Sequence, residues 1–460
     1  MSSQSSTYRN NVLPGTGRSD LNLGNFALPE GFSPHRRSHR MSELASKTAR
    51  HAPGEEEHKG SKFLAQAGFI DKTASGIYSL LPLGLRVVSK IEAHVRAAMQ
   101  DLGSQEVQFP VLQPKHLLQA TNRWNVDVLY KLKGKEGKDS DFSLAFTHEE
   151  ACADFFGKRI TSYRDLPLSV FQLASKFRDE ARARSGLIRG KEFKMKDMYS
   201  AHPDQASLDA YYDLAHLKYM QLYKLFGLGE ATYLTYASGG DYSKFSHEYQ
   251  AVCPIGEDTI YIFDESGIAI NKEIFEDLDR KCPVTGSGNF REVRAVEVGN
   301  IFKLGTRFTD AYDKTYVGAD GQHHPIYMAS YGIGITRIIG TVAELASDDK
   351  GLSWSPAISP YSAHLVQLTR DPANESRASD IFSNMDASGL EVLFDDRSEV
   401  KPGAKFADAD LIGIPFRVVV SDKTLAENKV EIKRRNESGS GRLVNVDAAI
   451  NEIRALQVKA

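Results

Sequence analysis

The sequence predicts an α+β protein in which a domain built on an antiparallel sheet is followed by a smaller α/β domain. Two observations support this prediction. Between residues 56 and 356, strand-like segments cluster around long helical segments without a strict βαβ rhythm, which is typical of an α+β layer. After the proline-containing stretch 355–360, strand and helix patterns alternate regularly through residues 360–460, which indicates a separate α/β domain of normal size.

Hydrophobic periodicity places the individual elements. Apolar residues at helical spacing predict a helix over Leu85–Leu102, and Glu106–Pro110 alternates as a strand that ends at the proline. Further strands are expected at 168–174, 191–196, 259–263, 293–298 and 326–331, with helices at 207–226 and 334–347. In the second domain we expect strands at 363–368, 390–394 and 415–420, helices at 373–387, 403–412 and 446–457, and a short hairpin before the last helix.

Composition narrows the possible functions only a little. Of the 460 residues, 41% are hydrophobic and 25% are charged, which is a globular balance with ample core material. The net charge of -3 neither indicates nor excludes a nucleic-acid partner, since a basic face can coexist with an acidic remainder. Three widely spaced cysteines form neither a disulfide framework nor a zinc quartet and fit a reducing compartment. Because the chain lacks a run of about 18 apolar residues, no membrane span is expected.

Residues 1–55 differ in composition from the rest of the chain. This segment is rich in serine and arginine, poor in acidic residues and interrupted by proline and glycine. Such a composition is typical of an organelle transit peptide, and a plain disordered tail has it as well. We expect the folded sequence to begin near Lys59.

An arginine-rich segment between two strand-like stretches is the strongest chemical signal. Phe-Arg-Asp-Glu at 177–180 is followed by Arg182, Arg184 and Arg189, and then by Lys-Glu-Phe at 191–193. Because guanidinium groups bind phosphate and carboxylate in a bidentate manner, the segment indicates a site for polyphosphate or for phosphate and carboxylate together. On charge alone, a solvated basic face paired with the neighbouring acids is the alternative.

This segment closely resembles motif 2 of the class II aminoacyl-tRNA synthetases in its prolyl version, including Arg-x-Gly-Leu-x-Arg in the loop. The resemblance implies that Arg178 binds the α-phosphate of ATP and the amino-acid carboxylate, and that Glu180 contacts adenine. It also implies that Arg189 contacts the distal phosphates and that Phe193 stacks on adenine. Ala183 stands where the family commonly has proline, a departure that removes no functional group.

The segment Tyr-Gly-Ile-Gly-Ile-Thr-Arg at 331–337 opens a helix. A Rossmann site is excluded, because Arg337 replaces the third glycine of that fingerprint and no acidic residue follows at the required distance. Gly-x-Gly-x-x-Arg after a strand resembles motif 3 of the class II synthetases instead, which implies that Arg337 lies beside the γ-phosphate at a helix N-terminus. The helix, strand and proline over Leu85–Pro110 resemble motif 1, which implies a homodimer.

Three further segments resemble the amino-acid pocket of the prolyl-tRNA synthetases. Thr147 and Glu149 belong to a Thr-x-Glu-Glu segment, in which a hydroxyl and a carboxylate can accept the two N–H groups of proline. His247, in Ser-His-Glu-Tyr, is implied to lie near the proline ring or its carboxylate. Glu297 is implied to hold a Mg²⁺ ion that bridges the ATP phosphates, since Mg²⁺ prefers oxygen ligands, and Phe302 to line the ring pocket.

No zinc site is expected. His148-Glu149 would begin a His-Glu-x-x-His metalloprotease pattern, but Cys152 replaces the second histidine. The threonyl-tRNA synthetases, one alternative, build a zinc site from Cys and His ligands, and no such constellation is evident in the sequence. The other alternative is a non-catalytic, synthetase-like regulatory subunit. Such a subunit should have lost Arg178, Arg337 or Glu297, and the sequence has all three.

Residues 360–460 resemble the anticodon-binding domain of these synthetases, through Phe-Asp-Asp-Arg at 394–397 and Lys-Val-Glu-x-Lys-Arg at 429–434. Because cations position a nucleic-acid backbone, Lys433, Arg434 and Arg435 are candidates for anticodon contacts, an ordinary solvated strand end being the alternative. Residues 199–297 leave no room for the editing insertion of the family. The resemblance therefore implies a compact, bacterial-like prolyl-tRNA synthetase that forms prolyl-adenylate from L-proline and ATP with Mg²⁺ and charges tRNA(Pro). From the N-terminal composition we expect it in the mitochondrial matrix, with the cytoplasm as the alternative.

Overall fold

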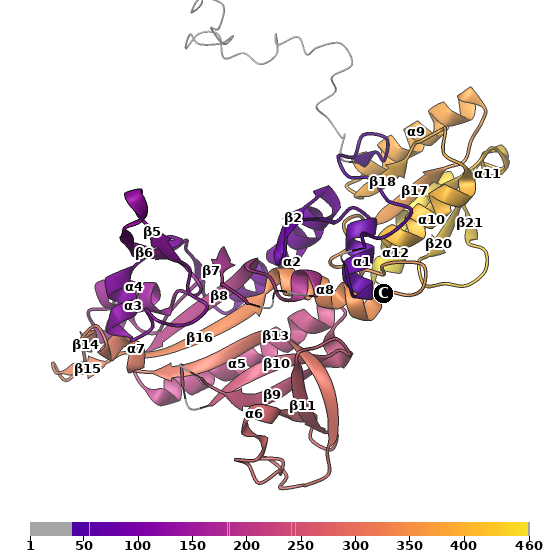
Figure 1. Ribbon diagram of the computed structural model, residues 1–460. Coiled ribbons are helices and arrows are strands. Elements are labelled where there is room, and N and C mark those ends of the chain that lie inside the picture. The colour runs from indigo at the N-terminus through magenta and orange to yellow at the C-terminus, as the bar shows by residue number, and fades with distance from the viewer. Residues whose placement is uncertain are drawn as a thin grey trace, which may run out of the picture.

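The computed structural model describes residues 39–54, 56–181, 183, 185–240, 242–243 and 245–458. Figure 1 shows two parts, a larger first domain built around a long sheet and a smaller C-terminal domain coloured orange to yellow. Among the described residues, no helix combines the length and the apolar character needed to cross a membrane.

A large sheet organises the first domain and confirms the α+β prediction. Over the described residues it has nine strands in the order β10-β9-β12-β11-β13-β16-β8-β7-β3. Strand β13 also pairs with β10, so the five strands from β9 through β13 form a closed ring of pairings. The strands are β3 (Gln105–Glu106), β7 (Leu168–Phe177), β8 (Glu192–His202), β9 (Thr232–Ser238), β10 (Phe245–Val252), β11 (Asp258–Phe263), β12 (Ile268–Asn271), β13 (Arg291–Gly305) and β16 (Tyr327–Gly334).

Helices cover one face of this sheet and leave the other face for the site. α2 (Pro82–Asp101), α5 (Gln205–Leu225) and α8 (Ile335–Ala346) pack on the sheet and on one another, and their apolar residues form the main core with those of the strands. Strand alternation separates the two faces: Met198 of β8 belongs to this core, whereas Met195 and Asp197 line a cavity on the opposite face.

The remaining elements of the first domain surround the sheet. Their helices are α1 (Lys59–Gln66), α3 (Lys115–Ala120), α4 (Glu149–Arg159), α6 (Lys272–Phe275) and α7 (Arg307–Asp310). Their strands are β1 (Ile70–Ala74), β2 (Ile77–Leu80), β4 (Leu112–Pro114), β5 (Lys131–Lys133), β6 (Asp139–Leu144), β14 (Thr315–Val317) and β15 (His323–Pro325).

The predicted strand at 106–110 is wrong in its extent. Only Gln105–Glu106 pair with β7 as β3, and the Val107 N–H still donates to the Phe171 carbonyl at 2.8 Å. Two residues later, the Phe109 N–H donates to the Gln172 side chain instead, at 2.9 Å. Because a side chain takes the place of the ladder partner, the strand ends there.

The C-terminal domain is the predicted α/β unit. Its sheet has the order β18-β17-β19-β20-β21, in which β18, β17 and β19 are parallel and the last two strands form the predicted hairpin. The strands are β17 (Ala363–Gln367), β18 (Val392–Asp395), β19 (Phe416–Val420), β20 (Lys429–Arg434) and β21 (Arg442–Asn445). The helices are α9 (Pro372–Ala387), α10 (Pro402–Ile412), α11 (Asp422–Ala426) and α12 (Ala449–Val458).

Residues 39–54 do not form the tail that composition suggested. Met41 and Leu44 are buried, and the Met41 N–H donates to the Phe394 carbonyl of β18 at 2.8 Å. Arg40 pairs with Asp396 at 3.2 Å. The start of the described chain therefore packs on the C-terminal domain, whereas Ala49 donates its N–H to the Gln66 carbonyl of α1 at 2.8 Å. Residues 1–38, on which the rest of that prediction falls, lie outside the described residues, as do Arg182 and Arg184.

Candidate active site

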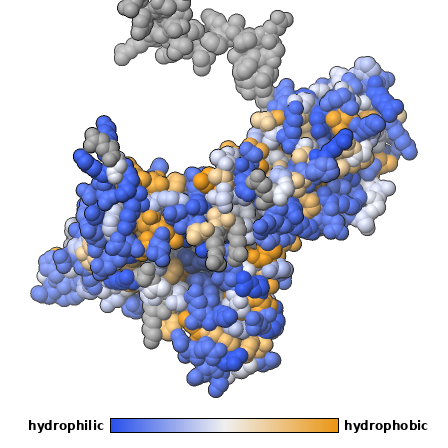
Figure 2. Space-filling model, in the orientation of Figure 1, coloured by the Kyte–Doolittle hydropathy of each residue, from blue (hydrophilic) through white to orange (hydrophobic). Residues whose placement is uncertain are grey.

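Two cavities lie side by side on the uncovered face of the sheet and share Arg178 and Glu180. Figure 2 shows this face hollowed near the centre of the first domain. The cavity whose lining includes Thr147, Glu149 and Phe302 has a volume of about 260 Å³; after the role that the sequence leads us to expect, it is called the proline-side cavity below. The cavity whose lining includes Arg189, Glu297 and Arg337 has a volume of about 230 Å³ and is called the nucleotide-side cavity.

Arg178 follows β7 directly, in the connection from β7 to β8, and its backbone N–H donates to the Lys191 carbonyl at 2.8 Å. Its guanidinium carbon lies 5.1 Å from the centre of the Phe193 ring. The Nε atom is buried and has no hydrogen-bond partner in the protein. Because a buried cationic donor without a partner is costly, this atom indicates that an anion binds where the two cavities meet.

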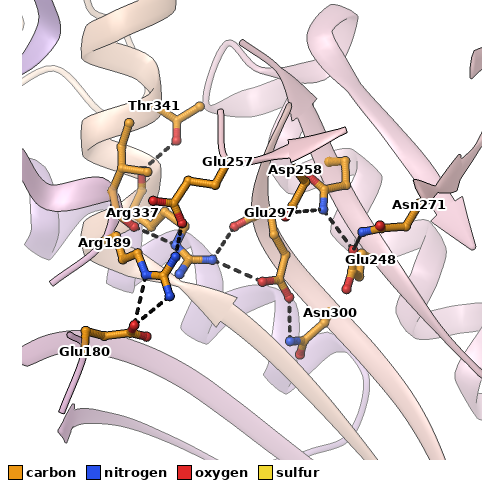
Figure 3. A network of polar contacts seen from close by, with 12 residues as sticks. Glu180, Arg189, Glu248, Glu257, Asp258, Asn271, Glu297, Asn300, Arg337 and Thr341 are labelled. Atoms are coloured by element: carbon orange, nitrogen blue, oxygen red, sulfur yellow. Dashed lines mark hydrogen bonds and ion pairs between the residues drawn. The ribbon is translucent and has the colours of Figure 1, made fainter. Parts of the chain in front are cut away.

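The nucleotide-side cavity contains two arginines that acidic residues already orient. Arg189 donates to Glu180 through Nη2 at 2.7 Å and also pairs with Glu257. Arg337, in the first turn of α8, donates through Nη1 to the carboxylate of Glu297 at 3.2 Å. Figure 3 shows both guanidinium groups side by side within this network. The predicted nucleotide residues Arg178, Glu180, Arg189, Glu297 and Arg337 therefore all line one cavity.

Further acidic residues that the sequence did not indicate surround Glu297. Asn300 donates to the Glu297 carboxylate at 2.7 Å. Burial, and next the charge of Glu297, raise the pKa of Glu248 to about 8, so this carboxyl carries a proton near neutral pH. Burial also raises the pKa of Asp258, whose carboxylate accepts from Gln250 at 2.7 Å. The described residues hold no cluster of three or more potential metal ligands, so a metal ion here would depend on a ligand for part of its coordination.

The proline-side cavity joins polar groups at one end to an aromatic wall. Thr147 donates its hydroxyl to the carboxylate of Glu149, which begins α4, and Glu149 is almost fully buried. The rings of Phe302 and Tyr242 lie 4.8 Å apart in the wall, and Phe146 contributes a third ring to the lining. The sequence placed Thr147, Glu149 and Phe302 here but gave no signal for Tyr242.

Arg123 is the second residue of this cavity that sequence reasoning missed. Its side chain is 3% exposed, and Nη1 donates to Glu150 at 2.9 Å and to Glu149 at 3.4 Å. Arginine followed by tryptophan after a short helix could have drawn attention to it, but nothing in the local sequence links position 123 to position 149.

A buried polar network borders the same cavity, whose lining includes Asp197 and Tyr199. Asp197 receives the Lys176 ammonium at 2.8 Å and the Tyr199 hydroxyl at 2.9 Å. Lys176 also contacts Nδ1 of His148 at 2.5 Å. Burial lowers the pKa of His148 to about 4, with the Lys176 charge adding to the effect, so this ring is neutral near neutral pH. The network fixes the backbone that precedes Glu149.

Two predicted site residues line neither cavity. His247 was placed near the proline, but it lies outside both cavities: its Nδ1 is 2.8 Å from the Tyr212 hydroxyl of α5, and its ring packs 4.6 Å from Tyr236. The next residue, Glu248, faces the site, and strand alternation turns His247 to the helix-covered face. Phe193 lies against Arg178 and lines neither cavity.

The three anticodon candidates differ in their surroundings. Lys433, Arg434 and Arg435 all line a small pocket of about 30 Å³, to which Lys350 also contributes. Arg435 is 5% exposed and forms a bidentate pair with Asp348 at 2.7 and 2.8 Å. Arg434 donates to the Leu456 carbonyl at 3.3 Å. Arg435 therefore joins the C-terminal domain to the segment after α8. Of the three, Lys433 alone has no side-chain hydrogen bond or ion pair among the described residues, although all three residues, counted with their backbone, are half-buried.

Comparison with known proteins agrees with this arrangement. The tRNA synthetase class II core domain family (G, H, P, S and T) matches residues 130–346, and an anticodon binding domain family matches residues 357–456. A proline–tRNA ligase of Methylobacterium radiotolerans is 34% identical over 434 residues, which cover 89% of this chain and 98% of that protein. The chain belongs to the proline–tRNA ligase family. The family predicted from the motifs is thereby confirmed.

Two further proline–tRNA ligases that resemble this chain differ in length. The proline–tRNA ligase of Rhizobium meliloti is 32% identical over 440 residues, covering 90% of this chain and 99% of its own. The alignment with the proline–tRNA ligase of Bacillus cytotoxicus, at 29% identity, extends over 566 positions, more than the 460 residues of this chain. That ligase therefore contains sequence that this family member lacks, as expected of a compact form.

A solved family structure has the same fold. The prolyl-tRNA synthetase of Cryptosporidium parvum, in complex with L-proline and AMP, matches with a TM-score of 0.72 at 18% identity. The match covers 87% of this chain and 75% of the other.

Proposed function

We propose that this chain forms prolyl-adenylate from L-proline and ATP and transfers the prolyl group to the 3′ end of tRNA(Pro). The observation that carries the proposal is the meeting of the two cavities at Arg178, whose buried Nε has no partner in the protein. One cavity offers acceptors for an ammonium group beside an aromatic wall, and the other offers arginines for a polyphosphate. The junction is the position at which a carboxylate and an α-phosphate would have to react.

Proline fits the first cavity through its secondary ammonium. Its two N–H groups would donate to the Thr147 hydroxyl and the Glu149 carboxylate, and its ring would lie against Phe302 and Tyr242. Its carboxylate would then point to the guanidinium of Arg178, which can bind it in a bidentate manner.

ATP fits the second cavity with its α-phosphate at Arg178. The proline carboxylate attacks the α-phosphorus of ATP. The bond between this phosphorus and the oxygen that bridges the α- and β-phosphates breaks, and pyrophosphate leaves between Arg189 and Arg337. The terminal ribose hydroxyl of the tRNA then attacks the acyl carbon, and AMP leaves. Both steps depend on positioning and on charge stabilisation by preorganised donors, and neither needs a covalent enzyme intermediate.

Glu297 is the residue we propose for Mg²⁺, together with the phosphates of ATP. The donors nearby suit the ion, because Mg²⁺ takes carboxylate and phosphate oxygens and Glu297 is held at its place by Asn300 and Arg337. When bound, the ion supplies positive charge that offsets the charge developing on the phosphates.

Three further parts of the proposal concern the whole molecule. We propose a homodimer through α2, because Leu85 is 49% exposed beside an open groove lined by α2 and Glu391. Light scattering tests the dimer by measuring the mass of the protein in solution. Lys433 is proposed to contact the tRNA. A mitochondrial matrix location is supported by the composition of residues 1–38. A fusion of that segment to a fluorescent protein, followed in cells, tests the location.

ATP–pyrophosphate exchange by the purified chain tests the function. We expect exchange that depends on proline, and charging of tRNA(Pro) under the same conditions. Absence of exchange with proline, or stronger exchange with threonine or alanine, would overturn the proposal in favour of another synthetase or a non-catalytic subunit.

A further inference from the structure

The proposed reaction assigns no role to Arg123, yet this residue lies at the polar end of the proline-side cavity. Its single Nη1 atom contacts two carboxylates, Glu150 at 2.9 Å and Glu149 at 3.4 Å. Glu149 lines the cavity, whereas Glu150 does not and instead accepts from the Thr121 hydroxyl at 2.8 Å. The arginine thus connects a structural carboxylate to one that faces the substrate.

We propose that Arg123 is a positioning residue for proline recognition, which keeps Glu149 a carboxylate and turns it toward the secondary ammonium of the substrate. This inference rests on the proposed function, because it concerns how the same cavity selects proline. Proline needs acceptors for two N–H groups, and a protonated Glu149 would present an O–H donor in place of one of them.

Burial makes this support necessary. Burial is the largest influence on Glu149 and raises its pKa; the positive charge of Arg123 opposes that rise, and the negative charge of Glu150 adds to it. Without Arg123, two adjacent buried carboxyls would share one apolar environment with no cation in contact. Such an arrangement favours a proton on at least one of them.

The surroundings favour arginine over any other cation. The guanidinium carbon lies 4.4 Å from the centre of the Tyr242 ring, 4.8 Å from that of Phe146 and 5.5 Å from that of Phe308. A planar, weakly hydrated cation can stack on rings while it donates to carboxylates, whereas an ammonium group acts as a compact point charge. Tyr242 and Phe146 line the cavity, so Arg123 also supports the wall on which the proline ring would rest.

Other titratable groups also act on Glu149, so the test must isolate Arg123. Besides Arg123, the titratable groups that interact with Glu149 come from α4, β7, β8 and the segment before β10: Glu150, Cys152, Lys176, Tyr199 and Tyr242. A substitution at position 123 leaves all of them in place, and the difference from the wild-type chain reports the arginine alone.

The experiment compares Arg123→Met and Arg123→Lys with Arg159→Met in proline-dependent ATP–pyrophosphate exchange from pH 5.5 to 8.5. Arg159 is a matched control, because its guanidinium also lies near a ring, 5.8 Å from Phe155, but is exposed and outside both cavities. For Arg123→Met we expect a KM for proline raised about 10- to 100-fold, with the KM for ATP changed less than about threefold. The acid limb of kcat/KM for proline should move to higher pH. Arg123→Lys should be intermediate, and Arg159→Met should match the wild type.

Two results would overturn the inference: an unchanged KM for proline in Arg123→Met, or KM values for proline and ATP that rise together without a shift of the acid limb. A wild-type chain without proline-dependent exchange would instead overturn the proposed function. If Arg123→Met does not fold, Glu150→Gln decides. It retains Arg123 and removes the charge that raises the pKa of Glu149, so the acid limb should move to lower pH. A limb that stays or moves to higher pH contradicts the inference.

Discussion

The two cavities that meet at Arg178 are built in different ways. The nucleotide-side cavity takes most of its charged groups from two short motifs, and its arginines are partly exposed: Arg189 is 36% and Arg337 26% exposed. The proline-side cavity takes its groups from segments spread between α3 and β16 and buries them: Arg123 is 3% and Glu149 6% exposed. One cavity thus draws mainly on two motifs and leaves its arginines partly exposed, whereas the other draws on several segments and buries its charged groups.

The difference has an energetic side. Ion pairs that are partly exposed, such as Arg189 with Glu180, contribute roughly 0–1 kcal/mol and can exchange partners with an incoming phosphate at low cost. A buried pair such as Arg123 with Glu149 and Glu150 is fixed, since loss of one partner strands a charge at a cost of about 3–5 kcal/mol. The nucleotide side is therefore suited to rearrangement and the proline side to discrimination.

A substitution of Arg178 should have the largest effect on activity, because Arg178 belongs to both cavities. Arg178→Ala should lower kcat/KM for proline and for ATP together, by about a thousandfold or more, since it removes the donor for both the carboxylate and the α-phosphate. ATP–pyrophosphate exchange measures the loss. A thermal melt within a few degrees of the wild type shows that the fold is intact. Loss confined to one substrate would contradict the shared position.

A matched pair of substitutions separates the two cavities. Glu149→Gln should raise the KM for proline by about 10- to 100-fold and leave the KM for ATP nearly unchanged, because it removes a charged acceptor from the proline side alone. Glu297→Gln should do the reverse, and its defect should lessen as the Mg²⁺ concentration rises. If both variants raise the same KM, the division of the site is wrong.

His247→Ala tests the correction that the structure makes to the sequence-based site. Because His247 packs with Tyr236 and Tyr212 behind the sheet, its loss should lower the free energy of unfolding by about 1–3 kcal/mol. The KM for proline should stay within about twofold of the wild type. Burial lowers the pKa of His247 to about 4, so it should add no pH dependence between pH 6 and 8. A large rise in the KM for proline, with an unchanged melting temperature, would show that His247 contributes to the proline-side cavity after all.

The smallest expected effect concerns the domain junction. Hydrogen bonds from Arg435 hold the pKa of Asp348 well below its usual range, so the stabilisation that this pairing contributes is present above about pH 4 and is lost as the pH falls below it. Because Asp348 is half exposed, Asp348→Asn should lower the free energy of unfolding at pH 7 by no more than about 1 kcal/mol. The melting temperature should fall only slightly. At pH 3 the difference between the variant and the wild type should be smaller than at pH 7, and it should vanish only as the pH falls through the lowered pKa of Asp348. Thermal melts across this range measure the convergence, and an equal difference at both pH values would contradict the account.

The contrast between the cavities also explains what could be predicted from sequence. Helices with strong apolar periodicity, such as α2 and α8, were predicted within a few residues. The strand pair β7 and β8, which the arginine-rich loop joins, was also predicted, although β8 continues to His202 and not only to residue 196. The two short motifs contribute four residues that line the nucleotide-side cavity as expected: Arg178, Glu180, Arg189 and Arg337. The fold of the C-terminal domain followed from its regular βαβ pattern.

What the sequence could not supply depends on contacts between distant segments. The face of β10 on which His247 lies is set by its pairing with β13, and a one-residue change of register would reverse it. Arg123 meets Glu149 only through the packing of α3 against α4, and Met41 meets β18 across most of the chain. The early end of the strand at β3 depends on one side chain, Gln172, which takes a backbone N–H.

The central claim is that the two cavities form one site joined at Arg178. Titration calorimetry with a non-hydrolysable prolyl-adenylate analogue tests it most directly. We predict one analogue bound per chain, at least about 100-fold tighter than proline, and displaced by proline and by ATP alike, since such an analogue spans both cavities. Displacement by only one of the two substrates, or affinity no better than that of proline, would contradict the account.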